Sequence, residues 1–499
     1  MTPPQHTLPI AAQRDAILGA LASEKLVLTS PPGSGKSTLV PLWGLQIAPR
    51  VLVIEPRRVA CRSLARYVAQ QMGTPLGQQV GYAVRHDDRL SAETKVAFVT
   101  PGVALRMLEQ RRVQDETLVV LDEFHERTLE LDLLLAVLLA RQHAHLAVLS
   151  ATLEAQRVAR HMGGQHLHVE GTLHPVELRH VGDDPLPHRE HLAERVVAAL
   201  GPLERLDGDA LVFLPGKAEI AACADLLANS PYFAPLPLHA GLTSAEQDRA
   251  FEPSTRPRAI LATNVAETSI TLPGVRAVVD SGLVRRTTYR EGRGALALMA
   301  ISSASADQRM GRAGRLAPGV CLRLWHRSGK LEAHTPPEIW REDLSGLMLS
   351  ALRLGHQPLR LPWLDRPRDF AFKEGERVLV DLGAARCEEN DKLLLTETGK
   401  RLGALPVDAA LGRLLVAATK ERLLLGDMIL LVASLGSRRP LFIRGEPRLP
   451  EDEGHDDPLT AARCDASARV LALRDPRRYG RRLRRDGLDE ALQNARQLA

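Results

Sequence analysis

Residues 30–37, Ser-Pro-Pro-Gly-Ser-Gly-Lys-Ser, have the types and spacing needed to hold phosphate groups. They fit the pattern G-x-x-x-x-G-K-[ST] of a phosphate-binding loop (P-loop), except that Ser30 replaces the first glycine. In such a loop, glycines let backbone amides curl around phosphate oxygens, and the helix that follows adds its positive end. Lys36 would reach the β- and γ-phosphates of a nucleotide, and the Ser37 hydroxyl would ligate Mg²⁺. The residues expected to bind the nucleotide are Pro32, Gly33, Ser34, Gly35, Lys36, Ser37 and Thr38.

Two adjacent acids end an apolar segment further along the chain. Residues 119–123 read Val-Val-Leu-Asp-Glu, which predicts a buried strand of the Walker B type. Carboxylates at the C-terminal tips of parallel strands face the crevice in which open α/β sheets bind ligands. Asp122 would hold the metal ion, and Glu123 would lie beside it and orient or activate the attacking water. A solvated Asp-Glu pair is the alternative, but it does not explain the position after a P-loop.

The elements that must position these residues alternate between strands and helices. Short apolar or β-prone segments occur at residues 25–29, 51–54, 96–99, 118–121 and 146–149. A second series occupies residues 210–214, 259–262, 277–279 and 319–325. Buried parallel strands have this pattern, so we predict two α/β domains in tandem, with the polar stretch at residues 171–191 as the linker.

The strand pattern fades after about residue 330. Residues 339–354 and 375–382 predict amphipathic helices, and residues 392–396 predict a strand after a polar turn, an order that indicates a winged helix. Residues 403–499 are predicted to be helical, apart from an acidic loop at 447–458, and they end in a basic segment at 477–485. The predicted domains are 1–172, 173–330, 331–402 and 403–499.

Composition places the chain among ordinary globular proteins. Of its 499 residues, 44% are hydrophobic and 25% are charged, which excludes a mainly disordered, collagen-like or disulfide-scaffold protein. No uncharged apolar run is long enough to span a membrane, and the N-terminus lacks the features of a secretory signal. The net charge of +5 is too small to identify a polyanion binder. Five widely spaced cysteines, an odd number, predict reduced thiols and a cytoplasmic location.

Residues 122–127, Asp-Glu-Phe-His-Glu-Arg, resemble motif II of the DEAH-box (DEAH/RHA, superfamily 2) helicases, and the phenylalanine matches their bacterial HrpB-type branch. Further motifs occur in the family's order at residues 55–60 (Ia), 100–102 (Ib), 150–152 (III), 211–216 (IV), 263–269 (V) and 308–315 (VI). The resemblance extends over residues 10–499. It implies two tandem RecA-like P-loop domains of α/β class, followed by a winged-helix domain and a helical-bundle, or ratchet-like, domain. Because the family usually carries an OB-fold and further C-terminal sequence, the chain is expected to be truncated.

The resemblance assigns roles to residues at the nucleotide. Arg312 and Arg315, three apart on an expected helix, would be arginine fingers that stabilise charge on the transferring phosphoryl group. Gln308 would place the attacking water, and Thr268 would contact the nucleotide. The residues expected to couple hydrolysis to domain movement are His125, Ser150 and Thr152.

In the family, the adenine lies between an arginine after motif Ia and a phenylalanine before motif V. The phenylalanine corresponds to Phe251, for which a position in the core is the alternative. The arginine's place holds Tyr67, with Arg66 adjacent, so either Tyr67 stacks on the base or Arg66 takes that place. Both arrangements imply weak selectivity among nucleobases.

The resemblance also implies sequence-independent, salt-sensitive contact with a nucleic-acid backbone. The residues expected to make it are Arg57, Arg58, Arg85, Thr100, Thr263 and Asn264. Residues 286–299 are predicted to form a β-hairpin that the family uses against the strand.

The implied function is that of an ATP-dependent RNA helicase, an NTP phosphohydrolase that uses ATP or other NTPs with Mg²⁺. It would act as a monomer, without a membrane partner, and translocate along single-stranded RNA. Three alternatives stay open: DNA as the polymer, remodelling of RNA–protein complexes without processive unwinding, and a catalytically silent binding module. The set of Lys36, Asp122, Glu123, Arg312 and Arg315 argues against the last.

Overall fold

The computed structural model describes residues 8–23, 25–31, 33–151, 154–171, 174–204, 207–267, 272–290, 293–315, 317–388, 392–437, 439–443, 464–479 and 482–499. The chain divides into two compact units. Unit 1 comprises Met1–Asp343 and Leu361–Arg368, and unit 2 comprises Leu344–Arg360 and Asp369–Ala499. Across these described ranges, no helix has both the length and the apolar character needed to cross a lipid bilayer. The domain limits at residues 172, 330 and 402 stay predictions.

The first sheet of unit 1 has eight strands in the order β4-β3-β5-β2-β6-β7-β1-β8. Neighbouring strands are parallel, except that β4 is antiparallel to β3. The strands are β1 Leu26–Thr29, β2 Val51–Ile54, β3 Val80–Val84, β4 Asp87–Arg89, β5 Val96–Val99, β6 Leu118–Leu121, β7 Leu146–Ser150 and β8 Gln165–His168. The five predicted strands are confirmed as β1, β2, β5, β6 and β7. The prediction lacked β3, which contains a glycine, and the polar edge strands β4 and β8.

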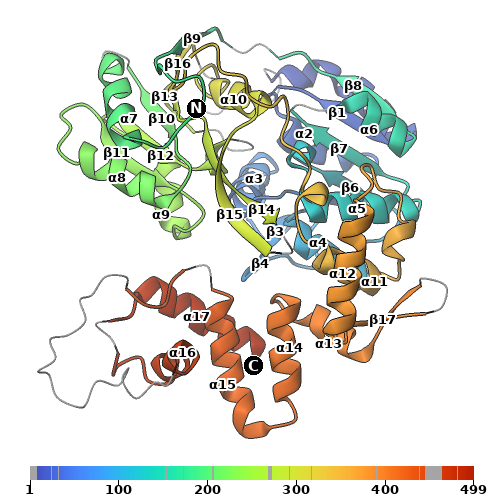
Figure 1. Ribbon diagram of the computed structural model, residues 1–499. Helices are drawn as coiled ribbons and strands as arrows, with labels where there is room; N and C mark the ends of the chain where they lie inside the picture. The colour runs from blue at the N-terminus through green and yellow to red at the C-terminus, as the bar shows by residue number, and fades with distance from the viewer. Residues whose placement is uncertain are drawn as a thin grey trace, which may run out of the picture. The chain divides into compact units, whose positions relative to one another are not determined.

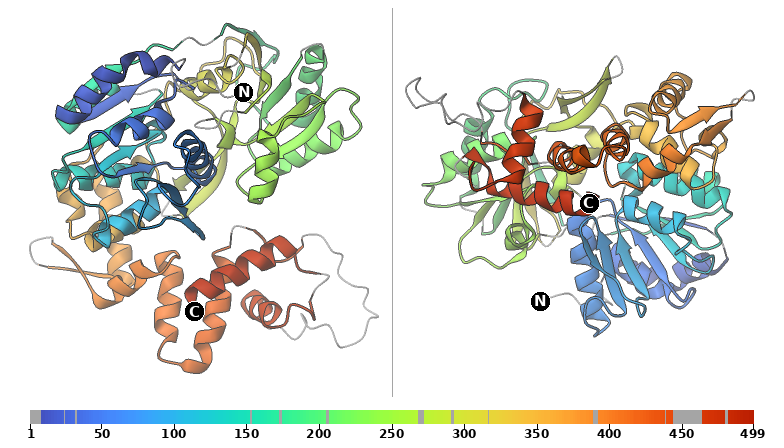
Figure 2. Two further views of the ribbon diagram at one scale, coloured as in Figure 1. Left: turned by 180° about the vertical axis from the view of Figure 1, so that it is seen from behind. Right: turned by 90° about the horizontal axis from the view of Figure 1, so that it is seen from below.

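Helices cover this sheet on both faces, as Figures 1 and 2 show. They are α1 Arg14–Ser23, α2 Lys36–Gly44, α3 Arg58–Gln71, α4 Pro101–Glu109, α5 Leu129–Ala140 and α6 Ala155–Met162. Strands β1, β2, β6 and β7 are therefore buried along their whole length, which explains their continuous apolar sequences. Helix α5 begins after Thr128, whose hydroxyl accepts a hydrogen bond from the Leu131 amide (3.3 Å).

The second sheet of unit 1 has six parallel strands in the order β11-β12-β10-β13-β16-β9. The strands are β9 Val176–His180, β10 Asp209–Phe213, β11 Ala234–Leu238, β12 Arg258–Ala262, β13 Val275–Asp280 and β16 Gly319–Arg323, with helices α7 Leu192–Leu200, α8 Lys217–Leu227, α9 Ser244–Asp248 and α10 Ser303–Met310. The interpretation of residues 171–191 as a linker is wrong in part, because β9 lies within them and pairs with β16. As an exposed edge strand, β9 lacks an apolar signal.

The predicted hairpin is confirmed, since β14 Leu283–Arg290 pairs antiparallel with β15 Arg293–Ala300. Its turn, residues 291–292, lies outside the described residues.

Unit 2 begins with two helices, a short hairpin and a third helix, the order typical of a winged helix. These are α11 Ser345–Arg353, α12 Asp369–Asp381, β17 Ala385–Cys387, β18 Leu393–Leu395 and α13 Glu397–Ala404. Among the described residues that follow, four helices form a bundle, in which α15 Arg422–Leu435 packs against α14 Ala409–Ala418, α16 Asp465–Arg474 and α17 Arg485–Leu498. The predicted helix at residues 339–354 is only partly correct, because a 3₁₀ turn, η7 Glu338–Trp340, precedes α11. The predicted acidic loop at 447–458 lies outside the described residues.

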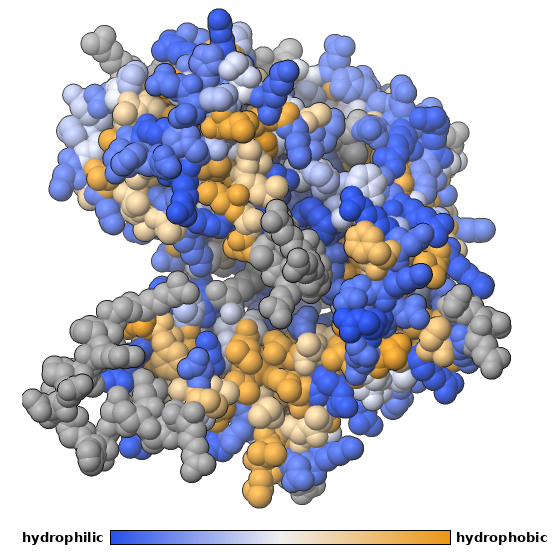
Figure 3. Space-filling model, viewed as in Figure 1, coloured by the Kyte–Doolittle hydropathy of each residue, from blue (hydrophilic) through white to orange (hydrophobic). Residues whose placement is uncertain are grey.

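Apolar side chains are exposed on the helical bundle of unit 2, as Figure 3 shows. Leu423 at the start of α15 is 91% exposed, and Leu424 and Leu414 are also exposed. All five cysteines of the chain are free thiols, and three of them are buried.

Candidate nucleotide and nucleic-acid site

The P-loop lies between β1 and α2, as predicted. Gly33 and Gly35 have φ angles of 88° and 98°, a left-handed region that favours glycine. A side chain at Gly35 would also crowd Leu8, because its Cβ would lie 2.9 Å from Leu8 Cδ1. Ser30, which replaces the first glycine, is buried, and its Oγ lies 2.6 Å from Ser34 Oγ. The Thr38 hydroxyl donates to the Gly35 carbonyl (3.0 Å), and Pro32 lies outside the described residues.

The two acids of the Walker B segment follow β6 and meet the P-loop at the C-terminal edge of the sheet. Strand β7 separates β6 from β1, so both loops emerge on the same side. Lys36 Nζ lies 3.6 Å from Glu123 Oε1, and Lys36, Asp122 and Glu123 are all buried. Glu123 has a φ of 48°, unusual for a residue with a side chain, and this turn directs its carboxylate toward Lys36.

The surroundings of Asp122 fit a divalent metal ion. Oδ1 accepts a hydrogen bond from the Glu123 amide (2.8 Å), whereas Oδ2 is buried and accepts none from the described residues. Burial and the neighbouring charge of Glu123 raise the pKa of Asp122 to about 6, although Lys36 and the Ser37 hydroxyl oppose this. A buried carboxylate oxygen beside a serine hydroxyl is a suitable pair of hard ligands for Mg²⁺.

Motif II continues into contacts with motif III. His125 Nδ1 lies 3.3 Å from Glu123 Oε2 and 3.4 Å from Ser150 Oγ, at the end of β7. Burial lowers the pKa of His125, so the neutral ring is favoured. The three side chains thus connect the ends of two neighbouring strands. Thr152, the other residue expected in this network, lies outside the described residues.

Arg312 and Arg315 reach the same centre from the second sheet, but not from a helix. Helix α10 ends at Met310, and both arginines follow in a turn that contains Gly311 and Gly314. The prediction of a helix here is wrong, because glycine disfavours helix continuation. Burial lowers the pKa of Arg315 to about 10, while Glu123 opposes the shift. Burial and the nearby Arg315 also lower the pKa of Arg312, so an anion at this place would be stabilised by two guanidinium groups.

Two family models match the chain. The model described as "DEAD/DEAH box helicase" covers residues 10–161, and "Helicase conserved C-terminal domain" covers residues 191–317. The chain belongs to the DEAD/DEAH box helicases. The helicase motifs noted above therefore lie on two RecA-like domains, and the predicted fold class is confirmed.

Similar curated proteins include "ATP-dependent RNA helicase HrpB" of Escherichia coli, which is 35% identical over 436 residues, covering 83% of this chain and 53% of the relative. "ATP-dependent RNA helicase HrpA" of E. coli is 34% identical over 472 residues, covering 90% of this chain and 36% of the relative. A crystal structure of E. coli DEAH/RHA helicase HrpB superimposes with a TM-score of 0.80 at 32% identity, over 99% of this chain and 60% of that one. The chain thus spans between about a third and a half of the length of these curated relatives.

Gln308 lies on α10 and is half-buried, and Thr268 lies outside the described residues. The neighbour of Gln308, Arg309, was not predicted as a functional residue. Its Nη1 lies 2.8 Å from Asp280 Oδ1, its Nε lies 3.0 Å from Glu267 Oε2, and its guanidinium lies 4.8 Å above the Phe213 ring. This buried network ties motif VI to motif V. Its only sequence signal is the position of Arg309 within motif VI.

Glu55 is a second residue that the sequence did not single out. It is completely buried at the end of β2, and its Oε1 accepts from the Arg57 amide (3.2 Å). Burial raises its pKa well above the usual range, and the charges of Asp122, Glu123 and Glu126 act in the same direction. Asp122 and Glu123 therefore have a third buried carboxyl group beside them.

The residues expected at the nucleobase lie on facing segments of the two RecA-like domains. Phe251 ends the 3₁₀ turn η5 Arg249–Phe251. It is half-buried and packs against the apolar core of the second RecA-like domain. Exposed Arg66 on α3 has its Nη2 3.8 Å from Asp248 Oδ2, just before η5. Tyr67 instead packs against the first core.

Arg258 holds the backbone on either side of Phe251. Its Nη1 donates to the carbonyls of Arg249 (3.1 Å) and Glu252 (2.9 Å). Its Nε and Nη2 donate to Asp209 Oδ2 (2.9 and 2.6 Å) in a buried ion pair. The sequence carried no signal for this pair, since each residue simply begins an apolar strand.

The predicted nucleic-acid residues fall into two groups. Arg58, Arg85 and Thr100 follow the neighbouring strands β2, β3 and β5 and so gather at one stretch of the sheet edge. Thr263 and Asn264 follow β12 of the second sheet. Arg57 differs from the others, because its Nε lies 2.9 Å from Glu126 Oε1 and its Nη1 donates to the Asn264 carbonyl. In this arrangement Arg57 links motifs II and V across the two domains.

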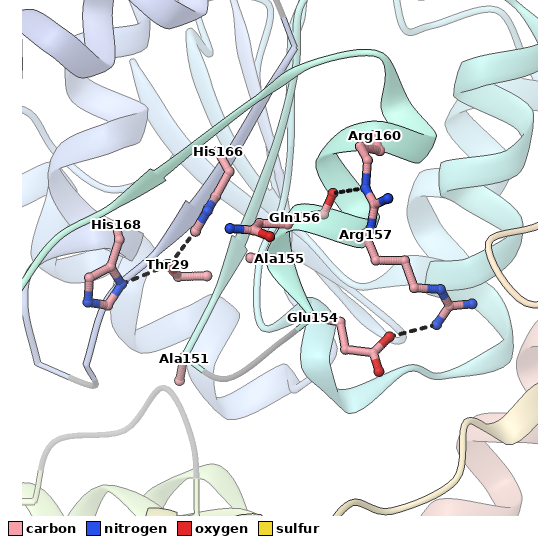
Figure 4. A pocket seen from close by; sticks show the side chains of 9 residues that line it. All are labelled: Thr29, Ala151, Glu154, Ala155, Gln156, Arg157, Arg160, His166 and His168. Carbon is pink, nitrogen blue, oxygen red and sulfur yellow. Dashed lines mark hydrogen bonds and ion pairs between the residues drawn. The ribbon is translucent and has the colours of Figure 1, made fainter.

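A hollow of about 690 Å³ is lined by Thr29 at the end of β1, by residues of β8 and by residues at the start of and along α6 (Figure 4). The Thr29 hydroxyl lies at hydrogen-bond distance from both His166 Nε2 (2.8 Å) and His168 Nδ1 (3.0 Å) of β8. Arg157 and Arg160 of α6 line the opposite wall. None of these side chains was predicted as a site residue, and the two histidines lie on β8, which was not predicted as a strand.

Proposed function

We propose that this chain hydrolyses ATP, and other NTPs, in the crevice between its RecA-like domains and uses the cycle to move along single-stranded RNA. The observation that carries the proposal is the convergence of two sets of charged side chains, all buried except the half-buried Arg315. Lys36, Asp122 and Glu123 come from the first sheet, and Arg312 and Arg315 come from the second, close enough to Glu123 to affect one another electrostatically. Cations around a carboxylate base suit the transfer of a phosphoryl group to water.

Each side chain has a role in the proposed reaction. Glu123, held near Lys36 and His125, would orient a water molecule and take its proton as the water oxygen bonds to the γ-phosphorus. The bond from that phosphorus to the β–γ bridging oxygen breaks, and ADP leaves with the bridging oxygen. Lys36, Arg312 and Arg315 would stabilise the charge on the phosphoryl oxygens. Mg²⁺, held by Asp122 and Ser37 with Glu123 alongside, would neutralise phosphate charge.

Movement would follow from the division of the site between two domains. The arginines complete it only when the second domain closes on the nucleotide, so each hydrolysis cycle would open and close the crevice. His125 and Ser150 connect Glu123 to the end of β7, and Arg57 connects motif II to motif V. We assign these contacts to coupling, so that a change at the γ-phosphate alters the surface beside the nucleic acid.

The nucleobase would be held loosely between Phe251 and Arg66. Arg66 is favoured over Tyr67 because its guanidinium already extends to Asp248, beside the turn that carries Phe251, whereas Tyr67 contributes to the first core. Stacking on a ring face suits any base, which supports acceptance of several NTPs.

RNA is proposed as the polymer because the curated relatives are named RNA helicases. Arg58, Arg85 and Thr100 offer contacts that suit a phosphate backbone, which both nucleic acids share. The same proposal includes unwinding of RNA, as opposed to remodelling of RNA–protein complexes. It also includes a cytoplasmic location and a monomeric state.

The test is steady-state ATPase activity of the wild type and of Glu123→Gln, with and without single-stranded RNA, over a salt series. We expect activity that rises with RNA, falls with added salt and is lost in the variant. Hydrolysis that is stimulated equally by DNA of the same sequence would favour the DNA alternative. RNA-stimulated hydrolysis without strand displacement on a duplex would favour remodelling. An undiminished rate in Glu123→Gln would refute the catalytic assignment.

A further inference from the structure

The turn of motif II has an unusual backbone at both ends. Glu123 and Arg127, which flank the 3₁₀ turn η3 Phe124–Glu126, have φ angles of 48° and 47°. Residues with a Cβ rarely adopt this left-handed conformation, and they keep it only where the surrounding structure holds them. The Glu123 end is held at the nucleotide site, so the Arg127 end needs its own anchor.

Arg127 is anchored through its side chain by two aspartates. Its Nε lies 2.8 Å from Asp132 Oδ1 on α5, and its Nη2 donates both to Asp132 Oδ2 (3.1 Å) and to Asp365 Oδ2 (2.6 Å). The guanidinium lies 5.6 Å above the ring of Phe124, which is itself completely buried. All three charged groups are buried, and charge-assisted hydrogen bonds of this kind hold a fixed geometry.

Asp365 is also held by α6, the helix that follows motif III. Its Oδ1 accepts from Arg157 Nη2 on α6 (2.5 Å), and the same nitrogen donates to the Leu364 carbonyl (3.0 Å). His161, one turn later on α6, lies with its Nε2 3.0 Å from the Pro362 carbonyl. Glu154, whose ion pair with Arg157 is visible in Figure 4, completes this group. The segment Leu361–Arg368 is thus fastened to the elements that follow both motif II and motif III.

The segment Leu361–Arg368 also connects two parts of unit 2 along the chain. The chain passes into unit 2 after Asp343, returns to unit 1 as Leu361–Arg368, and then leaves again for α12. The segment Leu344–Arg360 of unit 2, which contains α11, is therefore joined through the chain to unit 1 at both ends. On the N-terminal side, the Glu338 amide donates to the Arg127 carbonyl (3.1 Å) and Glu338 Oε2 accepts from the Leu129 amide (3.0 Å). Both attachments converge on Arg127.

We propose that Asp365, through Arg127, is a positioning residue for hydrolysis and that it makes the catalytic turn responsive to unit 2. The proposal rests on the proposed ATPase function. Asp365 touches no nucleotide, but it fixes the Arg127 end of a turn whose other end is Glu123. A change in unit 2 that displaces Leu361–Arg368 would loosen Arg127 and let the Glu123 carboxylate leave its place beside Lys36.

The test compares Asp365→Asn with Asp132→Asn, since both remove a partner of the same guanidinium. We expect Asp365→Asn to lower kcat roughly 10- to 100-fold with KM for ATP nearly unchanged, the loss typical of a small misplacement of a catalytic group. Asp132→Asn should lower basal kcat similarly. Only Asp365→Asn should also reduce the fold-stimulation by single-stranded RNA, because only Asp365 lies in the segment that connects to unit 2.

Two further variants serve as a second test of the segment and as a control. Arg157→Gln removes the second anchor of Asp365 at a half-buried position, so it tests the same segment if Asp365→Asn does not fold. The exposed Asp115→Asn is the surface control. A kcat and an RNA stimulation equal to wild type in both Asp365→Asn and Arg157→Gln would overturn the inference. The proposed function fails separately, if the wild type does not hydrolyse ATP or Glu123→Gln still does.

Discussion

Lys36 Nζ and Glu123 Oε1 are 3.6 Å apart, and both side chains are buried near the buried carboxyl groups of Asp122 and Glu55. Lys36 thus offsets the charge of Asp122 and Glu123. In the proposed reaction it would also contact the terminal phosphates of the nucleotide, beside the acids that would hold the metal ion and orient the water.

Lys36→Ala should therefore abolish ATP hydrolysis. The change would remove a phosphate contact and the cation beside the buried carboxyl groups of Asp122 and Glu123, so nucleotide binding should weaken together with turnover. Steady-state ATPase and equilibrium binding of ATP measure the two effects, with exposed Lys95→Ala as the matched control. Unchanged turnover in Lys36→Ala would remove the P-loop assignment.

Phe251→Ala should raise the KM for ATP by about fivefold, since loss of a stacking contact worth ~1 kcal/mol changes affinity by that factor. Arg66→Ala should have a similar effect, because Arg66 reaches toward Asp248 beside the turn of Phe251. Tyr67→Leu, which removes the ring and keeps an apolar side chain, should leave KM nearly unaltered, since Tyr67 packs against the apolar core of the first RecA-like domain. The measurement is KM for ATP and GTP in each variant. A raised KM in Tyr67→Leu but not in Arg66→Ala would reverse the assignment of the second stacking partner.

Asp209→Asn should act on the same KM from a distance. It removes the counter-charge of Arg258, which binds the carbonyls of Arg249 and Glu252 around Phe251. Breaking a buried ion pair costs about 3–5 kcal/mol, so we also expect the thermal midpoint of unfolding to fall. KM and the midpoint are compared with those of Asp225→Asn, an exposed acid of the same domain. If Asp209→Asn lowered the midpoint and left KM at the wild-type value, Arg258 would serve stability alone.

Glu338 should make stability depend on pH. Burial raises its pKa to about 7, and the negative charges of Glu130 and Glu342 act in the same direction. The hydrogen bond from the Leu129 amide and the charge of Arg341 lower the pKa but do not cancel this effect. A carboxyl group whose pKa is higher in the folded state contributes stability that is complete below about pH 4.5 and is lost as the pH rises through 7. Glu338→Gln cannot ionise, so it should unfold at the wild-type temperature near pH 4.5 and at a higher temperature at pH 8. Midpoints measured between these pH values test this; a constant difference would mean that Glu338 does not titrate in this range.

Much of the core could be predicted because its signals are local. Strands covered on both faces must be apolar throughout, and β2, β5 and β6 have the predicted bounds for that reason. The edge strands β8, β9 and β11 have at least one face or side exposed to solvent, so they carry no such run, and β9 was mistaken for part of a linker. In β11, Pro235 and Pro237 also argue against a strand in the sequence, although an edge strand tolerates proline.

The sequence by itself determined the two α/β domains, the P-loop, and the acids Asp122 and Glu123, because short-range patterns and strand order specify them. Only the tertiary structure decided which charges meet. Asp365 reaches Arg127 across 238 positions of sequence, and Arg258 meets Asp209 across 49. Arg57, expected to face nucleic acid, turns instead to Glu126 and Asn264. An ion pair forms only where two side chains meet in space. In these parallel sheets the spatial order of the strands differs from their order along the chain, so the sequence does not show which strand ends are neighbours.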